Sequence, residues 1–393
     1  MRYLMLVFLV SVLAACKNTS APVSAPTKAE VPAEKIAVQF RTATWRELPD
    51  WPGEQFLAGW PAFLKSCAQI GKRPEWKSIC VEANAIALGD YESIRRFFEN
   101  NFAPWRLENN TGASEAFITG YYDVLLKGSR NYKPGRVPLY GVPNDLLTID
   151  LGDLYPELKG KRVRGRLQGR TVVPYWSRSD IDSGKTKLDA NILGWADDPI
   201  DAFILHVQGS GRLQFEDGSL LRLGYADQNG QPYRSVGKWL VDRGELTLAQ
   251  ASMPAIRAWA QAHPARVQEL IDSNPSFIFF KVTPGASAAI GALNVPLTAG
   301  ASVAVDPKFI PLGSPLYLAT TYPAAIDTNP SDAPRVLHRL VQAQDTGGAI
   351  RGPLRVDYFC GSSAEAANLA GVMKQSGQLW LLWPKGLTPA AAP

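Results

Sequence analysis

Asp357 is the residue of this sequence best placed for acid–base chemistry. It lies in an alternating run, residues 354–359, in which Leu354, Val356 and Tyr358 share one face and Asp357 lies on the other. Aspartate is disfavoured inside strands, and apolar neighbours raise the pKa of a carboxyl group, which suits a general acid. The alternative is a solvated aspartate on an edge strand, because unusual carboxylates mark active sites only statistically.

Two further aspartates punctuate the C-terminal part of the chain. Asp345 begins a Gly-rich turn, where an aspartate commonly caps backbone N–H groups, and Asp306 precedes a proline at the end of a predicted strand. The turn at residues 344–352 has the glycine spacing of a phosphate-binding loop, but no Lys-Ser or Lys-Thr pair follows it, so phosphate binding is not expected. Both aspartates therefore have a structural as well as a chemical interpretation.

The segment 208–212, Gln-Gly-Ser-Gly-Arg, invites a serine-nucleophile interpretation. It does not match G-x-S-x-G, and the sequence shows no strand-to-helix elbow. Polar contacts to a sugar from Gln208 and the nearby backbone are one interpretation, and a plain β-turn is the other. The three histidines, His206, His263 and His338, are scattered, and no Cys/His spacing is typical of a metal site, so we predict neither a metal nor another cofactor.

The N-terminus has the pattern of a targeting signal. A short basic start precedes an apolar run, residues 3–13, that is too short to span a bilayer, and Leu-Ala-Ala then precedes Cys16. This resembles a bacterial lipobox, which implies cleavage after residue 15 and a lipid on Cys16. Lys17 at the next position favours the periplasmic face of the outer membrane. The alternative is an ordinary signal peptide with an incidental cysteine. Residues 16–40 then predict a lipid anchor and a flexible tether.

Composition indicates a globular body that is large enough for two domains. Removing 15 of the 393 residues leaves 378, and 46% of the sequence is hydrophobic. The net charge of +5 comes without a basic cluster, so nucleic-acid binding is not expected, while an anionic polymer remains a suitable substrate. Cys67 and Cys80 lie close together, and an oxidising compartment would allow a disulfide between them, leaving Cys360 as a buried free thiol.

The pattern of elements is mainly β with N-terminal and interdomain helices. Helices are expected between residues 51 and 102, with Asp90 as an N-cap, and between 248 and 273, divided at Pro264. A further helix is expected to begin at a Ser362/Glu365 capping box. Strands are predicted at residues 117–126, 202–208, 219–225, 297–306, 315–319, 336–341, 354–359 and 378–383.

Six motifs in order resemble the membrane-bound lytic murein transglycosylase A family, over nearly the whole chain after the tether. They are the lipobox, Thr119-Gly120-Tyr121-Tyr122, His206-Val207-Gln208-Gly209-Ser210-Gly211, Asn274-Pro275-Ser276-Phe277-Ile278-Phe279-Phe280, Val303-Ala304-Val305-Asp306-Pro307 and Gln344-Asp345-Thr346-Gly347-Gly348-Ala349-Ile350-Arg351-Gly352. Ala301 departs from the family pattern, since many relatives have Arg there. This puts a local salt bridge in doubt but does not affect the expected chemistry.

The resemblance implies a domain plan. Residues 1–15 would be a signal peptide, and residues 41–122 with 284–393 would form a double-psi β-barrel, the three-aspartate (3D) module. Residues 123–283 would form an inserted second, β-barrel-like domain that binds substrate across a groove.

The resemblance also implies an exo-type peptidoglycan lytic transglycosylase. Such enzymes cleave the β-1,4 bond between N-acetylmuramic acid and N-acetylglucosamine and leave 1,6-anhydro ends. Asp357 would be acid and then base, while Asp345 and Asp306 support it; Asp345 could orient Asp357, tune its pKa or stabilise oxocarbenium charge. The expected glycan-binding residues, with aromatic faces stacking on sugars, are Thr119, Gly120, Tyr121, Gln208, Gly209 and Ser210.

Two other functions stay open at this point. A glycoside hydrolase on the same barrel would use Asp345 or Asp306 as the base for water, and hydrolases place two carboxyl groups at defined separations. A non-catalytic glycan-binding lipoprotein would not need Asp357. The expected partners are peptidoglycan glycan strands and, through Cys16, a membrane. The sequence does not indicate protein partners among wall-synthesis or amidase complexes.

Overall fold

The computed structural model describes residues 38–159, 161, 163–285, 288–323 and 335–390. The predicted signal peptide, Cys16 and most of the predicted tether lie outside the described residues, as does most of the Pro/Asp-rich loop that ends at Pro334. Among the described residues, no helix is both long and apolar enough to span a bilayer.

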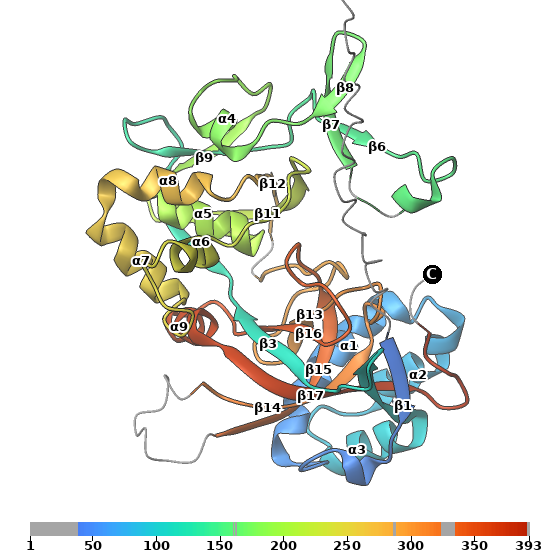
Figure 1. Ribbon diagram of the computed structural model, residues 1–393. Helices are drawn as coiled ribbons and strands as arrows, with labels where there is room; N and C mark the ends of the chain where they lie inside the picture. The colour runs from blue at the N-terminus through green and yellow to red at the C-terminus, as the bar shows by residue number, and fades with distance from the viewer. Residues whose placement is uncertain (1–37, 160, 162, 286–287, 324–334, 391–393) are drawn as a thin grey trace, which may run out of the picture. The chain divides into compact units, whose positions relative to one another are not determined.

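An eight-stranded sheet contains a closed ring (Figure 1). Its order is β1-β2-β17-β14-β15-β13-β16-β3, and β3 also pairs with β17, so the last six strands form a barrel. Val303, Val341, Val356 and Leu379 are fully buried inside it. The strands are β1 Val38–Thr42, β2 Phe102–Asn109, β3 Ala116–Tyr121, β13 Ser302–Ala304, β14 Pro315–Thr321, β15 Val336–Asp345, β16 Arg355–Phe359 and β17 Lys374–Pro384.

A second, six-stranded sheet is built from the middle of the chain in the order β12-β11-β10-β4-β9-β5, and its two outer strands approach each other. The strands are β4 Val124–Ser129, β5 Val137–Tyr140, β9 Ile192–Ala196, β10 Gly211–Gln214, β11 Leu220–Gln228 and β12 Ile278–Val282. Its helices are α5 Pro199–Gln208, α6 Val236–Asp242, α7 Met253–Ala262 and α8 Val267–Asp272. A three-stranded sheet carries β6 Leu147–Ile149, β7 Val163–Gln168 and β8 Thr171–Pro174, followed by α4 Arg178–Asp182.

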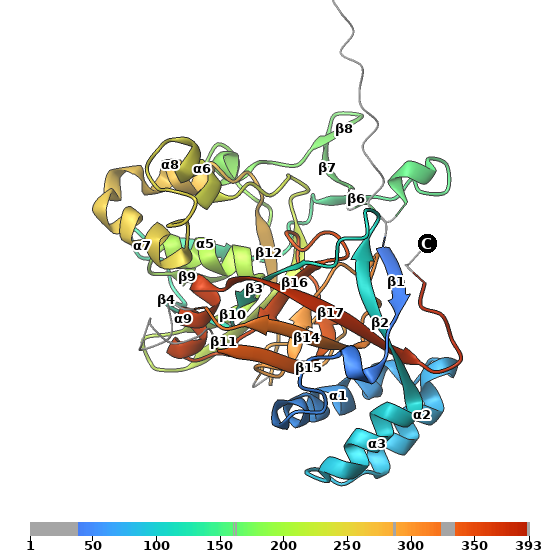
Figure 2. The same ribbon diagram turned by 60° about the horizontal axis from the view of Figure 1, so that its bottom comes forward.

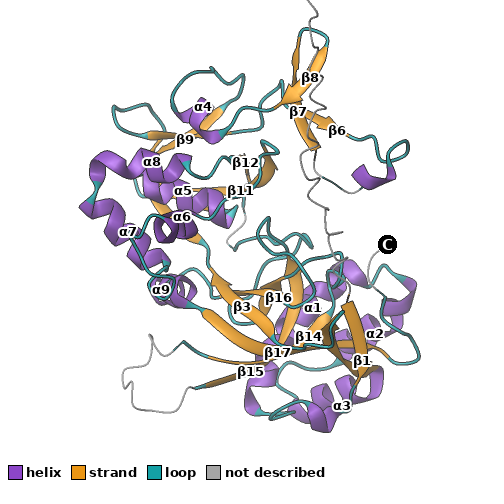
Figure 3. Cartoon of the chain, viewed as in Figure 1, coloured by secondary structure: helices purple, strands orange, loops and turns teal. Residues whose placement is uncertain are grey.

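Three N-terminal helices pack against the barrel strands, as Figure 2 shows. They are α1 Trp60–Ile70, α2 Pro74–Ala85 and α3 Tyr91–Asn101, and their aromatic side chains form one buried cluster with those of β14 and β17. The predicted N-cap is confirmed, since the Asp90 carboxylate accepts a hydrogen bond from the Ser93 N–H at 3.1 Å. The structure contains a disulfide bond between Cys67 of α1 and Cys80 of α2, while Cys360 is a half-buried free thiol. Figure 3 shows two groups of strands with helices packed beside each group, which confirms the mainly β prediction.

The predicted strand at residues 202–208 is wrong, because this segment is the helix α5. Periodicity could not separate the two, since the helix is apolar on nearly every side and buried throughout its middle. The end signals were present in the sequence. Asp198 caps the helix by accepting a hydrogen bond from the Asp201 N–H, Pro199 occupies the first turn, and Gly209 ends the helix with a φ of 77°.

Three smaller corrections concern element ends. The helix predicted from Ser362 is α9, Ala364–Val372, and Ser363 is its cap, because its hydroxyl accepts a hydrogen bond from the Ala366 N–H. The predicted strand at 117–126 is two strands, β3 and β4, that belong to different sheets. The predicted strand at 297–306 is reduced to the three residues of β13. Pro264 divides α7 from α8 as predicted.

Asp123 anchors the crossing from the barrel to the second sheet. It follows β3, and its N–H donates to the Gly361 carbonyl at 2.8 Å. Its buried carboxylate accepts both terminal nitrogens of Arg222 at 3.0 Å, and Nε of Arg212 lies 3.0 Å away. Arg212 also donates to the Ser362 carbonyl at 3.1 Å. A buried ion pair therefore fixes this crossing to the segment that follows β16.

Candidate active site

The strand register brings two of the three predicted aspartates into one row. The short strand β13 lies between β15 and β16, so Ala304 pairs with Asp345 on one side and with Asp357 on the other. On the far side of β16, Thr119 of β3 pairs with Asp357. Residues paired across neighbouring strands point to the same side of a sheet. The four strands of this row, β15, β13, β16 and β3, can be followed in Figure 1.

Asp357 is a partly buried carboxyl group in the interior of a sheet. The edge-strand alternative is therefore wrong, since β16 lies between β13 and β3. The Thr119 hydroxyl donates to Oδ1 of Asp357 at 2.5 Å. Burial raises the pKa of Asp357, and this effect exceeds the lowering by the Thr119 hydrogen bond and by the Arg355 charge. The expected raised pKa is borne out, and it favours a protonated form that can act as an acid.

Asp345 is held as a hydrogen-bond acceptor through both of its oxygens. Oδ1 accepts the N–H groups of Ala292 at 3.0 Å and of Thr346 at 2.9 Å, while Oδ2 accepts the Tyr121 hydroxyl at 3.0 Å. Burial raises the pKa of Asp345 to about 6, although these hydrogen bonds lower it and the Asp357 charge raises it. Between the two described carboxyl groups there is a charge interaction but no hydrogen bond.

Asp306 has a structural contact rather than a free carboxylate. It is buried, with 3% of its surface exposed, and follows β13 by two residues. Its Oδ2 accepts the Gly352 N–H at 2.9 Å and its Oδ1 accepts the Lys308 N–H at 3.2 Å. The carboxylate therefore ties the Gly-rich loop after Asp345 to the end of β13, which supports the site without facing it as a free base.

Three predicted glycan-binding residues of β3 have other contacts. Tyr121 is buried and its ring packs against Phe359, with 5.1 Å between the ring centroids. The expectation that its ring would offer an open face for stacking on a sugar is therefore not met. A Cβ at Gly120 would lie 2.9 Å from the Cα of Ala370, so this glycine admits α9 against the strand. Thr119 contacts Asp357 directly. Thr119 and Tyr121 of the β3 motif thus each contact one of the two carboxyl groups.

The other three predicted glycan-binding residues lie where α5 ends. Gln208 accepts a hydrogen bond from the Tyr122 N–H at 3.2 Å, which connects it to the residue after β3. Gly209 is the left-handed helix cap, and Ser210 follows it half-buried. His206 is buried in the same helix and its Nδ1 accepts the Ile278 N–H at 3.0 Å, so it cannot activate Ser210 as a base.

Arg355 is a site residue that the sequence reasoning did not single out. It pairs with Phe117 in the register, two residues before Asp357 on the same face of β16. Its Nη2 donates to the Thr119 hydroxyl oxygen at 2.7 Å. The available signal was its position, because residues i and i+2 of a strand lie side by side.

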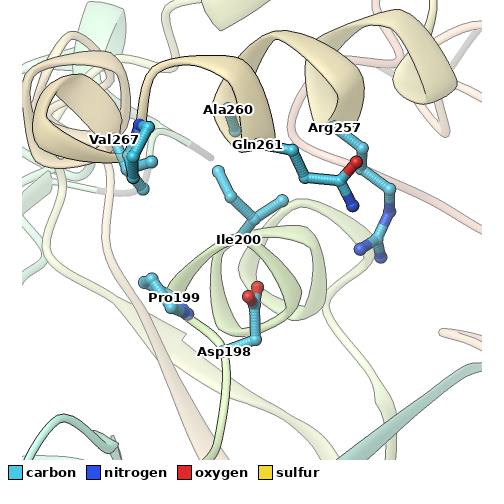
Figure 4. A pocket seen from close by; sticks show the side chains of 8 residues that line it. Asp198, Pro199, Ile200, Arg257, Ala260, Gln261 and Val267 are labelled. Atoms are coloured by element: carbon cyan, nitrogen blue, oxygen red, sulfur yellow. The ribbon is translucent and has the colours of Figure 1, made fainter.

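A cavity of about 300 Å³ lies elsewhere, between α5 and the α7–α8 segment (Figure 4). Its lining includes Asp198, Ile200, Arg257 and Gln261, and none of the three predicted catalytic aspartates. In the part of the chain that the structure describes, no group of three or more His, Cys, Asp and Glu side chains is arranged to hold a metal ion.

Comparison with known proteins defines the class. Residues 117–281 match the family described as the MltA specific insert domain, and residues 301–383 match the 3D domain. The chain is 36% identical over 299 residues to the membrane-bound lytic murein transglycosylase A of Escherichia coli K12, covering 75% of this chain and 72% of that protein. These matches define a lytic transglycosylase fold in which a 3D domain is combined with an MltA insert.

Solved structures agree with this class. MltA from Neisseria gonorrhoeae, in its monoclinic form, superposes with a TM-score of 0.76 at 35% identity, covering 91% of this chain and 95% of that one. E. coli MltA with bound chitohexaose gives a TM-score of 0.68 at 30% identity, covering 90% and 95%. The chain therefore belongs to the membrane-bound lytic murein transglycosylase A family.

Proposed function

We propose that this protein is a peptidoglycan lytic transglycosylase. It cleaves the β-1,4 bond between N-acetylmuramic acid and N-acetylglucosamine and leaves 1,6-anhydromuramic acid ends. The names of its relatives support the reaction class. The observation that carries the assignment is the contrast in hydrogen bonding between two neighbouring carboxyl groups: both oxygens of Asp345 accept hydrogen bonds, whereas Asp357 accepts one, from Thr119, through Oδ1. Burial raises the pKa of both groups.

Asp357 performs both proton transfers in this proposal. In its protonated form it donates to the leaving glycosidic oxygen as the bond from C1 breaks. The resulting carboxylate then accepts the proton of the 6-hydroxyl group of the muramic acid as that oxygen bonds to C1. The proton balance closes on one residue, and the internal nucleophile replaces water, so its proximity supplies much of the rate.

Asp345 is the electrostatic partner in the proposed reaction. Two N–H groups and the Tyr121 hydroxyl favour its ionised form, and an ionised carboxylate stabilises the positive charge that develops at C1. Of the roles that the sequence left open, direct orientation of Asp357 is the least supported, since no hydrogen bond joins these two described side chains. Asp306 supports Asp345 by holding the loop that follows it.

We assign substrate binding to the second sheet and to the residues at its crossing with the barrel. Residues 41–122 with 284–393 form the catalytic domain in this proposal, residues 123–283 form the inserted substrate-binding domain, and the glycan lies in a groove between them. Ser210 and Gln208 are half-buried at the end of α5, beside the crossing. The relative from E. coli whose structure contains chitohexaose supports an oligosaccharide ligand.

We also propose that the enzyme is a lipoprotein on the periplasmic face of the outer membrane. The support is the lipobox pattern of the sequence, with cleavage after residue 15 and lipid attachment at Cys16. Residues 17–37, which precede β1, provide reach to the glycan strands in this proposal; the predicted tether is shorter than 16–40, because residues 38–40 pair with β2. Cys16→Ser should abolish labelling with a fatty-acid probe and move the protein from the membrane to the soluble fraction of cells. Equal labelling of the variant and the parent would refute the anchor.

Mass spectrometry of digested peptidoglycan tests the reaction. A soluble form that lacks residues 1–16 should release muropeptides with 1,6-anhydro ends, and Asp357→Asn, which keeps the shape without the acid proton, should release none. Exo cleavage would give products from strand ends before shorter strands accumulate. Hydrated, reducing ends would instead identify a hydrolase with Asp345 as base. Absence of products from folded parent protein that still binds glycan would identify a binding protein.

A further inference from the structure

Arg355 is fixed in place by both strands of the β3–β16 pair. Its guanidinium carbon lies 5.1 Å from the centroid of the Phe117 ring, and its Nη1 donates to the Val356 carbonyl at 2.6 Å. Its Nη2 donates to the Thr119 hydroxyl oxygen at 2.7 Å. A half-buried arginine with donors committed in two directions has few alternative conformations. The distances place Thr119 directly between Arg355 and Asp357.

The donor inventory of these groups fixes the direction of the short hydrogen bond. A guanidinium group has donors only, so the Thr119 oxygen must accept from Arg355. A hydroxyl group has one proton, and the Asp357 Oδ1 lies 2.5 Å from the Thr119 oxygen. The Thr119 oxygen has two lone pairs, of which Arg355 uses one, and among the described residues Oδ1 of Asp357 is the acceptor found for its single proton. The Thr119 proton therefore points to Oδ1. Because Oδ1 accepts the Thr119 proton, the acid proton of Asp357 does not lie between Oδ1 and Thr119.

We propose that Arg355 is a positioning residue that acts through Thr119 to keep the acid proton of Asp357 on Oδ2. This inference rests on the proposed function. With Arg355 absent, the Thr119 hydroxyl can turn and accept a proton from Oδ1, and the acid proton then points into the protein instead of toward the substrate. Arg355 thus raises the share of Asp357 that is protonated on the productive oxygen, without touching the glycan.

The charge of Arg355 adds a second, separable effect. It lowers the pKa of Asp357 against the larger effect of burial. The other titratable groups that face Asp357 are Asp345 of β15, Tyr121 of β3 and Cys360 at the end of β16, all with raised pKa values, while β13 contributes the uncharged Ala304. Removal of Arg355 leaves no cation among these groups to oppose burial, so the pKa of Asp357 rises.

A double-mutant cycle of Arg355→Met and Thr119→Val tests the inference. Arg355→Met should lower kcat about tenfold with little change in KM, as expected for losing the orientation of a charge-assisted hydrogen bond. An acid works only when protonated, so the alkaline limb of the pH profile should move to higher pH. Because Arg355 acts through Thr119, the double variant should be no slower than Thr119→Val alone. Arg355→Lys keeps a charge and a donor and should recover most of the rate.

The matched control is Arg73→Met, which removes an exposed arginine directly before α2 and should leave kcat and the pH profile unchanged. Additive losses in the double variant, or an Arg355→Met profile that superposes on the parent, would overturn the inference while the parent still makes anhydro products. A parent without anhydro products would overturn the proposed function itself. If Arg355→Met does not fold, Thr119→Val tests the same shift of the alkaline limb, with Arg355→Lys as the variant expected to keep a parent-like profile; a parent-like limb in Thr119→Val overturns the inference.

Discussion

Replacing Asp306 by alanine should cost stability rather than the chemical step. The substitution removes the acceptor of two backbone N–H groups, those of Gly352 and Lys308. The Gly352 N–H is half-buried, and leaving it without an acceptor costs about 1–3 kcal/mol, whereas Lys308 is exposed and its N–H can bind water, for a cost of about 1 kcal/mol. The free energy of unfolding should therefore fall by about 2–4 kcal/mol.

Thermal unfolding converts this loss into an observable shift. An unfolding entropy of about 2.1 cal/mol/K per residue gives about 0.75 kcal/mol/K for the unit Ile36–Pro393, so the Tm should fall by about 3–5 °C. The Tm of Asp306→Asn should fall by a similar amount, because the asparagine amide keeps one acceptor oxygen but turns its NH₂ group toward the other backbone N–H donor. Asp242→Ala, which removes an exposed surface ion pair, is the control and should change stability by less than about 0.5 kcal/mol.

Activity separates the two possible roles of Asp306. At a temperature where the variant is folded, its kcat should stay within about tenfold of the parent, because only the position of the loop after Asp345 changes. Asp357→Asn should lose all anhydro product in the same assay. A variant of Asp306 with an unchanged Tm and the same complete loss would refute this reasoning and place Asp306 in direct contact with the reacting sugar.

Three further variants test contacts described above. Tyr121→Phe removes a hydrogen bond that lowers the pKa of Asp345, so this pKa should rise above about 6. Because Asp345 must lose its proton for activity, the acidic limb of the pH profile should move to higher pH. An unmoved acidic limb would exclude an ionised Asp345 from the mechanism. Asp123→Ala removes the buried carboxylate that pairs with the Arg222 guanidinium and should destabilise the protein by about 3–5 kcal/mol in urea unfolding, which an unchanged midpoint would contradict. Opening the Cys67–Cys80 disulfide by a double serine variant should cost about 3 kcal/mol, given the 13-residue separation, and equal Tm values with the parent would contradict this.

The position of Asp357 in a strand could be predicted because its apolar neighbours alternate. The N-cap at Asp90 and the break at Pro264 could also be predicted, because each depends only on a few adjacent residues. Helix α5 could not be assigned from periodicity, because a helix buried on nearly all sides lacks an amphipathic pattern. Its end signals, an aspartate followed by proline and a terminal glycine, were the stronger evidence.

The contacts of the site could not be predicted from local sequence. The bond from Thr119 to Asp357 depends on parallel pairing between strands 238 residues apart, and nothing in either strand specifies that register by itself. The same holds for Tyr121, whose motif suggested an aromatic platform until its hydroxyl was found on Asp345. Asp306 and its loop contact likewise depend on a turn geometry that a proline after an aspartate suggests but does not define.

The closed ring of the barrel has a consequence for the order in which the enzyme comes into being. β3 is made early, the whole second sheet follows, and only then do β16 and β17 arrive to pair with it on both sides. During synthesis, the Thr119–Asp357 hydrogen bond therefore cannot form until β16, the last strand but one, has been made. The order of synthesis thus delays assembly of the Thr119–Asp357 pair until β16 has been made, and any fragment that stops before residue 355 lacks Asp357 altogether.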